Sequence, residues 1–198
     1  MLKFCHIMEF FEKFKLIEEF PDERTNEWQT AVSFPVFMAV SVGYVLASYL
    51  CVKHMKNRPA YYLDNFLIIY LLTMIFIYTY SLWECIICTR KLGYKLLFDE
   101  DKRNNRSPLE MRLLNVAWLM YLAKFFSLFL TFIRILKKRH PARFSYYIPE
   151  IFHHLGAFLI AWVDLKWYPT GENFCSAAPP LLHVVHDSLL LFILFILG

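Results

Sequence analysis

Glu150, His153 and His154 lie in the short stretch Glu-Ile-Phe-His-His, just inside a run of apolar residues. A further histidine, His183, lies in the next apolar run. Imidazole can act as a nucleophile, a base or a hydrogen-bond donor near neutral pH, and a carboxylate can orient it. An ionisable side chain inside a membrane span is costly and usually functional. We therefore interpret these four residues as a candidate reaction centre.

The composition indicates that these residues belong to a membrane protein. Of the 198 residues, 58% are hydrophobic and 19% are aromatic, and the mean hydropathy is positive. Soluble domains of this size are on average less apolar. The net charge of +4 is modest, and we predict no binding of nucleic acid.

Five apolar runs are candidates for transmembrane helices, because a helix needs roughly 20 residues to cross the hydrocarbon core. They cover residues 31–52, 65–83, 113–133, about 151–163 and about 177–198. Lys124 interrupts the third run and is expected to face the interior of the bundle. The fourth run is short for a crossing, although the aromatic residues 144–148 would lengthen it. The pattern predicts an all-α fold, a polytopic membrane helix bundle with about five transmembrane helices.

Residues 1–29 are predicted not to span the membrane. The first 27 residues contain seven acidic and four basic side chains, which is too acidic for a cleavable signal peptide. No internal repeat is present, and we predict a single domain over residues 1–198. Basic residues gather after the first and third runs, so the positive-inside rule places both connections in the cytosol.

The five cysteines are not expected to form a disulfide framework, because Cys51, Cys85 and Cys88 lie in or beside predicted spans. Cys85 and Cys88 have the spacing of a metal or redox motif, but their surroundings are apolar and no second pair accompanies them. We interpret them as packing residues and predict no metal site.

Short motifs along nearly the whole chain are similar, in the same order, to those of one known family. Residues 22–28 are similar to its Asp-x-Arg-Thr-x-x-Trp motif, residues 118–124 to Trp-Leu-Tyr-x-x-x-Lys, and residues 135–138 to Leu-Arg-Lys-Lys. Residues 152–154 match the end of its histidine box, HxxHH, and residues 162–171 are similar to the run that follows that box. The chain thus resembles the ELO family of very-long-chain fatty acid elongases, whose members have seven transmembrane helices.

The resemblance implies a multi-pass enzyme of the endoplasmic reticulum membrane, a 3-oxoacyl-CoA synthase (an acyltransferase). Such an enzyme condenses a long-chain acyl-CoA with malonyl-CoA to a 3-oxoacyl-CoA, with release of CO2 and CoA, and no cofactor is expected. The reaction needs an activated acyl group, a carbanion formed by decarboxylation, and donors that stabilise oxyanions. The partners it implies are the lipid bilayer, other elongases, and the reductases and dehydratase of the elongation cycle.

The resemblance also suggests roles for particular residues. By position, His153 and His183 are the candidates for acyl transfer and carbonyl contact, and His154 is the candidate for orienting or polarising. The helices would enclose a narrow apolar tunnel for the acyl chain, with basic side chains on the CoA phosphates at the cytosolic end. Our candidates for these phosphate contacts are Lys124, Lys137, Lys138 and Arg143.

The chain departs from the family's motifs at positions that carry chemistry. Glu150 replaces the first histidine of HxxHH, and its carboxylate is expected to accept a proton or to orient an imidazole. The family's KxxExxDT motif aligns with Lys124, Ser127, Leu130 and Thr131, so both of its carboxylates are missing.

Two other functions therefore stay open. One is a catalytically inactive elongase relative that acts as a membrane interaction partner, because spans still pack after catalytic groups are lost. The other is a histidine-box desaturase or hydroxylase, which needs many nitrogen ligands for two irons. Only His153-His154 and His183-x-x-His186 are paired here, and the retained histidines favour the condensing enzyme.

His186 and Asp187 are accessory candidates, because in a helix they would follow His183 by three and four residues. Their imidazole and carboxylate would replace groups that the motifs lack. We predict that Asp187→Ala lowers condensation activity at equal protein abundance, measured with labelled malonyl-CoA. An unchanged turnover would exclude this role.

Overall fold

The computed structural model describes residues 23–93, 106–141 and 143–167, and every regular element in these ranges is helical. Its four long helices are α3 (Phe34–Met55), α4 (Asp64–Leu92), α5 (Pro108–Leu136) and α6 (Ile148–Trp167). Each is long and apolar enough to cross a membrane. The shorter segments are η1 (Glu23–Trp28), α2 (Gln29–Val32) and η2 (Phe144–Tyr146). The predicted all-α polytopic bundle is confirmed, while the predicted fifth span, residues 177–198, lies outside the described residues.

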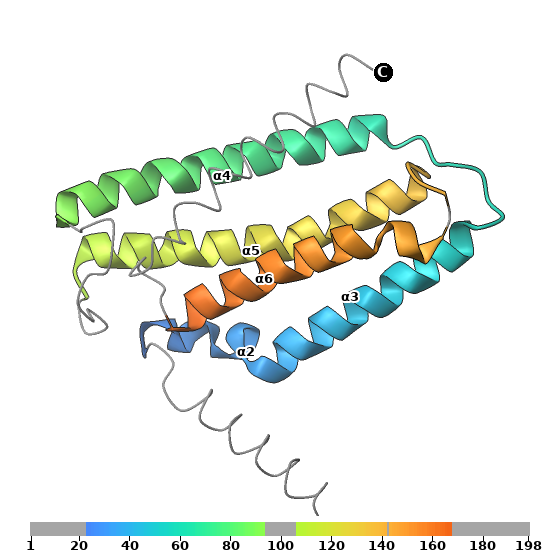
Figure 1. Ribbon diagram of the computed structural model, residues 1–198. Coiled ribbons are helices and arrows are strands. Elements are labelled where there is room, and N and C mark those ends of the chain that lie inside the picture. The colour runs from blue at the N-terminus through green and yellow to red at the C-terminus, as the bar shows by residue number, and fades with distance from the viewer. Residues whose placement is uncertain (1–22, 94–105, 142, 168–198) are drawn as a thin grey trace, which may run out of the picture.

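Helix α5 is the centre of the bundle and packs against α3, α4 and α6 (Figure 1). The connections after α3 and after α5 lie at the same end of the bundle (Figure 1). They are joined by a hydrogen bond of 3.0 Å from the Tyr61 amide to the Leu136 carbonyl, and by an ion pair between Lys137 and Asp64. We call this the basic end, after its bases Lys53, Lys56, Arg58, Lys137, Lys138, Arg139 and Arg143.

All four long helices extend beyond the predicted spans, and in α4 and α6 polar residues of the added turns find partners in the bundle. In α4, which runs on to Leu92, Glu84 accepts hydrogen bonds of 2.9 and 2.6 Å from Arg112 of α5. The fourth span is not short, contrary to the prediction, since α6 has 20 residues. It is longer at its C-terminal end, where Lys166 lies 5.1 Å from the centre of the Trp162 ring. Most of the aromatic segment 144–148 forms η2 instead of lengthening the helix.

Two helices are followed by a residue with left-handed backbone. Gly93 ends α4 with φ of 69°, which glycine adopts without strain. Lys138 follows α5 with φ of 50°, while its amide donates to the Ile135 carbonyl and the Arg139 amide donates to the Arg134 carbonyl. This is a Schellman motif with lysine at the position that glycine usually occupies. A non-glycine residue there costs roughly 1–2 kcal/mol.

A column of aromatic rings joins the N-terminal segment to three of the spans. Successive ring centroids are between 4.7 and 5.6 Å apart, within the range of favourable aromatic pairs. The column runs through Trp28 of η1, Trp118 and Tyr121 of α5, Phe158 of α6, Phe37 of α3 and Trp162 of α6. Trp162 Nε1 also donates a buried hydrogen bond of 2.7 Å to the Val32 carbonyl. These contacts fix α3, α5 and α6 against one another.

We predict that Trp162→Phe lowers the free energy of unfolding by about 1–3 kcal/mol, because the buried Val32 carbonyl loses its donor while the ring stack is kept. The measurement is thermal unfolding of the purified protein in detergent. Trp83→Phe is the matched control, since Trp83 is exposed on α4. Equal stability of the two variants would contradict the prediction.

Candidate functional site

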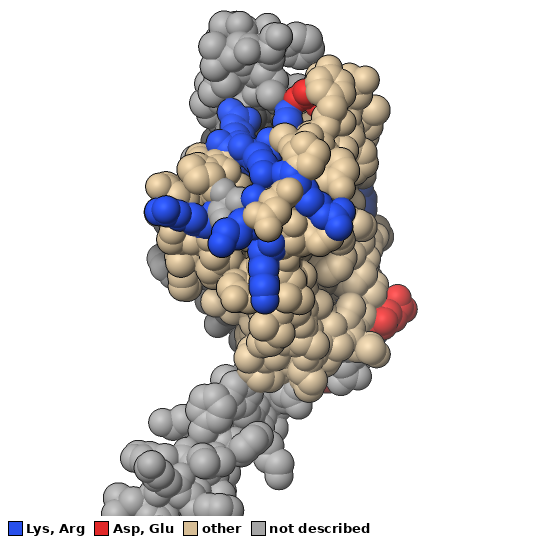
Figure 2. Space-filling model, turned by 90° about the vertical axis from the view of Figure 1, so that its right-hand side faces the viewer, with Lys and Arg blue, Asp and Glu red and all other residues tan. Residues whose placement is uncertain are grey.

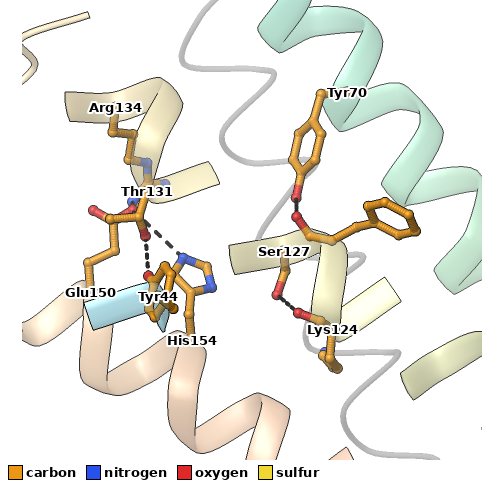
Figure 3. Close-up of polar contacts among 9 residues, drawn as sticks. Tyr44, Tyr70, Lys124, Ser127, Thr131, Arg134, Glu150 and His154 are labelled. Atoms are coloured by element: carbon orange, nitrogen blue, oxygen red, sulfur yellow. Dashed lines mark hydrogen bonds and ion pairs between the residues drawn. The ribbon is translucent and has the colours of Figure 1, made fainter. Parts of the chain in front are cut away.

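The carboxylate of Glu150 is the point at which three polar side chains meet (Figure 3). Its Oε1 accepts a hydrogen bond of 3.1 Å from Thr131 Oγ1 and lies 3.3 Å from Arg134 Nη1. His154 Nε2 is 3.7 Å from the same oxygen. Glu150 is largely shielded from solvent, and Thr131 and His154 are buried. A cation, a hydroxyl and an imidazole thus surround one carboxylate oxygen.

Tyr44 of α3 adds a second hydroxyl to this group. Its hydroxyl oxygen is 2.7 Å from Thr131 Oγ1, inside the core. Because the Thr131 hydroxyl has one proton and donates it to Glu150, Tyr44 is the donor in this contact. Three helices therefore form what we call the Glu150 cluster: Tyr44, Thr131, Arg134, Glu150 and His154.

The helical repeat explains why these side chains converge. Glu150 and His154 are four residues apart in α6, and Thr131 and Arg134 are three apart in α5. Residues at these spacings lie on one face of a helix. The packing of α6 on α5 brings the two polar faces together.

The two ring nitrogens of His154 have different surroundings. Nε2 faces the Glu150 carboxylate, which favours a proton on that nitrogen. Nδ1 is buried and has no hydrogen-bond partner within the described residues. An imidazole protonated on Nε2 carries a lone pair on Nδ1. His154 is therefore arranged to act as a base, a nucleophile or a hydrogen-bond acceptor.

His153 is exposed on the neighbouring face of α6. Its ring centroid lies 5.4 Å from that of His154, with an angle of 66° between the rings. The two imidazoles are thus in contact, one inside the bundle and one at its surface. His183, His186 and Asp187 lie outside the described residues.

Lys124 lies apart from the other predicted phosphate contacts. It is buried in the middle of α5, as predicted, with Nζ 4.7 Å from the centre of the Tyr78 ring. Its carbonyl accepts a hydrogen bond of 2.7 Å from Ser127 Oγ (Figure 3). Lys137 is 13 residues farther along, a rise of about 20 Å for a helix. The structure therefore does not place Lys124 in one site with the lysines of the basic end.

The other three predicted phosphate contacts lie together at the basic end, where Lys and Arg side chains gather on the surface (Figure 2). Lys137 forms an ion pair with Asp64. Arg143 is exposed and Lys138 is half-buried. This end presents several positive charges with little acidic surface between them (Figure 2).

Tyr147 connects the basic end to the start of α6. Its hydroxyl donates a hydrogen bond of 3.2 Å to the His140 carbonyl. Burial raises the pKa of the Tyr147 hydroxyl, so the group stays protonated and remains a donor.

Arg134 and Tyr44 are the members of the Glu150 cluster that our sequence analysis missed. Arg134 is one of 21 basic residues, and Tyr44 is one of 12 tyrosines, so residue type does not single them out. The available signal is Glu150 itself, because a carboxylate inside a membrane bundle needs a cationic partner.

The described cysteines and the Glu150 cluster differ in the chemistry that their side chains offer. Cys51, Cys85 and Cys88 are free thiols in the spans, as predicted. In the described part of the chain, no three His, Cys, Asp or Glu side chains gather as a metal site would require. The Glu150 cluster combines one imidazole and one carboxylate with a cation and two hydroxyls, which suits proton transfer or acyl transfer.

Comparison with known proteins identifies relatives of this chain. The profile of the GNS1/SUR4 family (ELO) matches residues 29–195. The chain is 28% identical to very long chain fatty acid elongase 2 of Mus musculus over 166 residues, which cover 83% of this chain and 54% of that protein. It is 25% identical to very long chain fatty acid elongase 5 of Tachysurus fulvidraco over 157 residues, which cover 79% of this chain and 51% of that protein.

The chain spans about half the length of the curated relatives it matches. The family match nevertheless covers all four described spans and every residue of the Glu150 cluster. On this match, the chain belongs to the GNS1/SUR4 (ELO) family.

Proposed function

We propose that this chain acts in fatty acid elongation as the condensing enzyme, a 3-oxoacyl-CoA synthase that joins a long-chain acyl-CoA to malonyl-CoA. The observation that carries the proposal is the buried His154, whose Nε2 faces Glu150 while Nδ1 has no hydrogen-bond partner within the described residues. Family membership supports it, since the relatives are named very long chain fatty acid elongases.

The proposed reaction forms one carbon–carbon bond. Loss of CO2 from malonyl-CoA leaves an electron pair on the α-carbon of the thioester, and this carbon attacks the acyl carbonyl. The bond from that carbonyl to its carrier, sulfur or imidazole nitrogen, then breaks, and the carrier takes up a proton. Negative charge develops on both carbonyl oxygens, so donors or cations must face them in a site that excludes water.

The histidines have separate roles in this proposal. His153 and His183 carry the acyl group and contact its carbonyl. His154 acts through Nδ1, as the base or acceptor that orients the reacting group. Glu150 fixes the His154 imidazole, as a carboxylate fixes histidine in a catalytic triad.

We place the CoA phosphates at the basic end. Arg143 is exposed there, and Lys138 keeps a backbone conformation in which glycine would be less strained. A functional need for the Lys138 side chain would explain why lysine, and not glycine, occupies this strained position. Lys137 is already paired with Asp64, and Lys124 lies about 20 Å away, so Lys138 and Arg143 are the stronger candidates.

The proposed setting is the endoplasmic reticulum membrane. A 3-oxoacyl-CoA must be reduced and dehydrated before another round, so reductases and a dehydratase are the proposed partners, together with other elongases. The condensation transfers no electrons to an outside acceptor, and we propose neither a redox cofactor nor a metal.

We predict that membranes containing this chain incorporate labelled malonyl-CoA into acyl chains, and that His154→Ala lowers the rate about 100-fold or more, because a proton-transfer group is lost. His153→Ala should also lower it strongly. His54→Ala, exposed near the end of α3, is the matched control and should keep the wild-type rate at equal abundance. If the wild-type chain shows no incorporation above background, the alternative becomes the inactive relative that binds other elongases.

We predict that Lys138→Gly raises the KM for malonyl-CoA about tenfold, the value of one hydrogen bond to a charged group. Thermal stability should hold or increase, because glycine relieves the left-handed backbone. Steady-state kinetics in membranes provide the measurement. Lys91→Gln removes an exposed lysine in the last turn of α4 and should leave KM unchanged; an equal rise in both variants would exclude a specific contact by Lys138.

A further inference from the structure

Arg134 has no role in the mechanism proposed above, yet it contacts the candidate reaction centre. It lies between two segments that resemble motifs of the family, residues 124–131 and 135–138. Although it is in the last turn of α5, near the basic end, its guanidinium lies 3.3 Å from Glu150 Oε1 (Figure 3). Its charge is therefore directed at the carboxylate.

The charge of Glu150 must be balanced inside the bundle. Its side chain is only 12% exposed, so the carboxylate has lost most of its hydration. The titratable groups that face it are Tyr44 from α3, Arg134 from α5, His154 from its own helix and Tyr147 just before that helix. Of these, Arg134 and His154 are the two that can be cations.

Whether Arg134 or a protonated His154 balances the charge of Glu150 decides which chemistry His154 can perform. An imidazolium carries a proton on each nitrogen and has no lone pair, so it cannot act as a base or nucleophile. Arginine stays charged at every pH that a protein experiences. With Arg134 beside Glu150, the carboxylate is balanced without a second proton on His154.

We propose that Arg134 is a positioning residue, which neutralises Glu150 and so keeps His154 a neutral imidazole with its proton on Nε2 and a lone pair on Nδ1. Thr131 and Tyr44 donate in series toward the same carboxylate oxygen, which holds it at one place between α5 and α6. The effect on turnover rests on the proposed function, whereas the protonation state of His154 can be measured without it.

The first test measures that protonation state directly. The full chain is labelled with ¹⁵N-histidine and purified, and the His154 signals are identified among its seven histidines by their loss in His154→Asn. Near neutral pH we expect a neutral His154 protonated on Nε2 in the wild-type chain, and an imidazolium in Arg134→Met. Arg134→Lys keeps the charge and should keep the neutral ring. Arg90→Gln removes an exposed arginine of α4 and should change nothing.

An imidazolium in the wild-type chain, or an unchanged ring in a folded Arg134→Met variant, would overturn the proposal. Because this readout needs no substrate, it remains decisive even if the chain proves inactive. If Arg134→Met does not fold, Arg134→Gln provides a second neutral side chain with hydrogen-bond donors, and the same outcomes apply.

The second test is a double-mutant cycle of Arg134→Met and Glu150→Gln, with labelled malonyl-CoA as substrate. Arg134→Met should lower kcat about 10- to 100-fold, with KM for malonyl-CoA unchanged. This is the loss that follows when groups that orient histidines in metal sites are removed. In the Glu150→Gln background the same substitution should have little further effect, because Arg134 acts through that carboxylate. A rise in KM that persists in this background would mean that Arg134 contacts CoA, and would overturn the proposal.

Discussion

Close packing of aromatic rings between α3, α5 and α6 is the constraint on which the rest of the structure depends. In lipid, apolar side chains gain little by leaving their surroundings, so spans associate through close contacts and polar bonds. The rings of Phe37, Tyr121, Phe158 and Trp162 supply such contacts. They fix how far α6 is shifted along α5 and how the two helices are rotated. A change in either would separate the residues of the Glu150 cluster.

The Glu150 cluster is the polar counterpart of the aromatic column. Burial of a carboxylate is costly unless its charge is balanced and it is hydrogen-bonded. Here Arg134, His154 and the Thr131 hydroxyl share that task at Oε1, and Tyr44 in turn donates to Thr131. Nδ1 of His154 is left without a partner within the described residues. A buried polar atom in that condition calls for an explanation, and a role in binding or reaction is one.

Glu150 and Arg134 are physically coupled. A histidine, which the family's box has at the position of Glu150, needs no counterion while its imidazole is neutral, whereas a carboxylate inside the bundle does. Arg134 supplies one at 3.3 Å from the preceding span. One residue without the other would leave a charge inside the bundle unbalanced. The carboxylate at this position is therefore one partner of an ion pair, whose other partner is Arg134, and its Oε1 also faces His154 Nε2.

The sequence by itself determined the membrane class, the existence of the four described spans and the residue types of the candidate reaction centre. Length, hydropathy and an ionisable residue in an apolar run are local properties that need no knowledge of neighbours in space. Only the tertiary structure decided that α4 continues beyond the predicted span, where Glu84 is paired with Arg112 across 28 residues of chain. It also decided the membership of the Glu150 cluster, since Arg134 and Tyr44 are 16 and 106 residues from Glu150. Ion pairs and hydrogen bonds depend on distance through space, and the packing of three helices sets that distance.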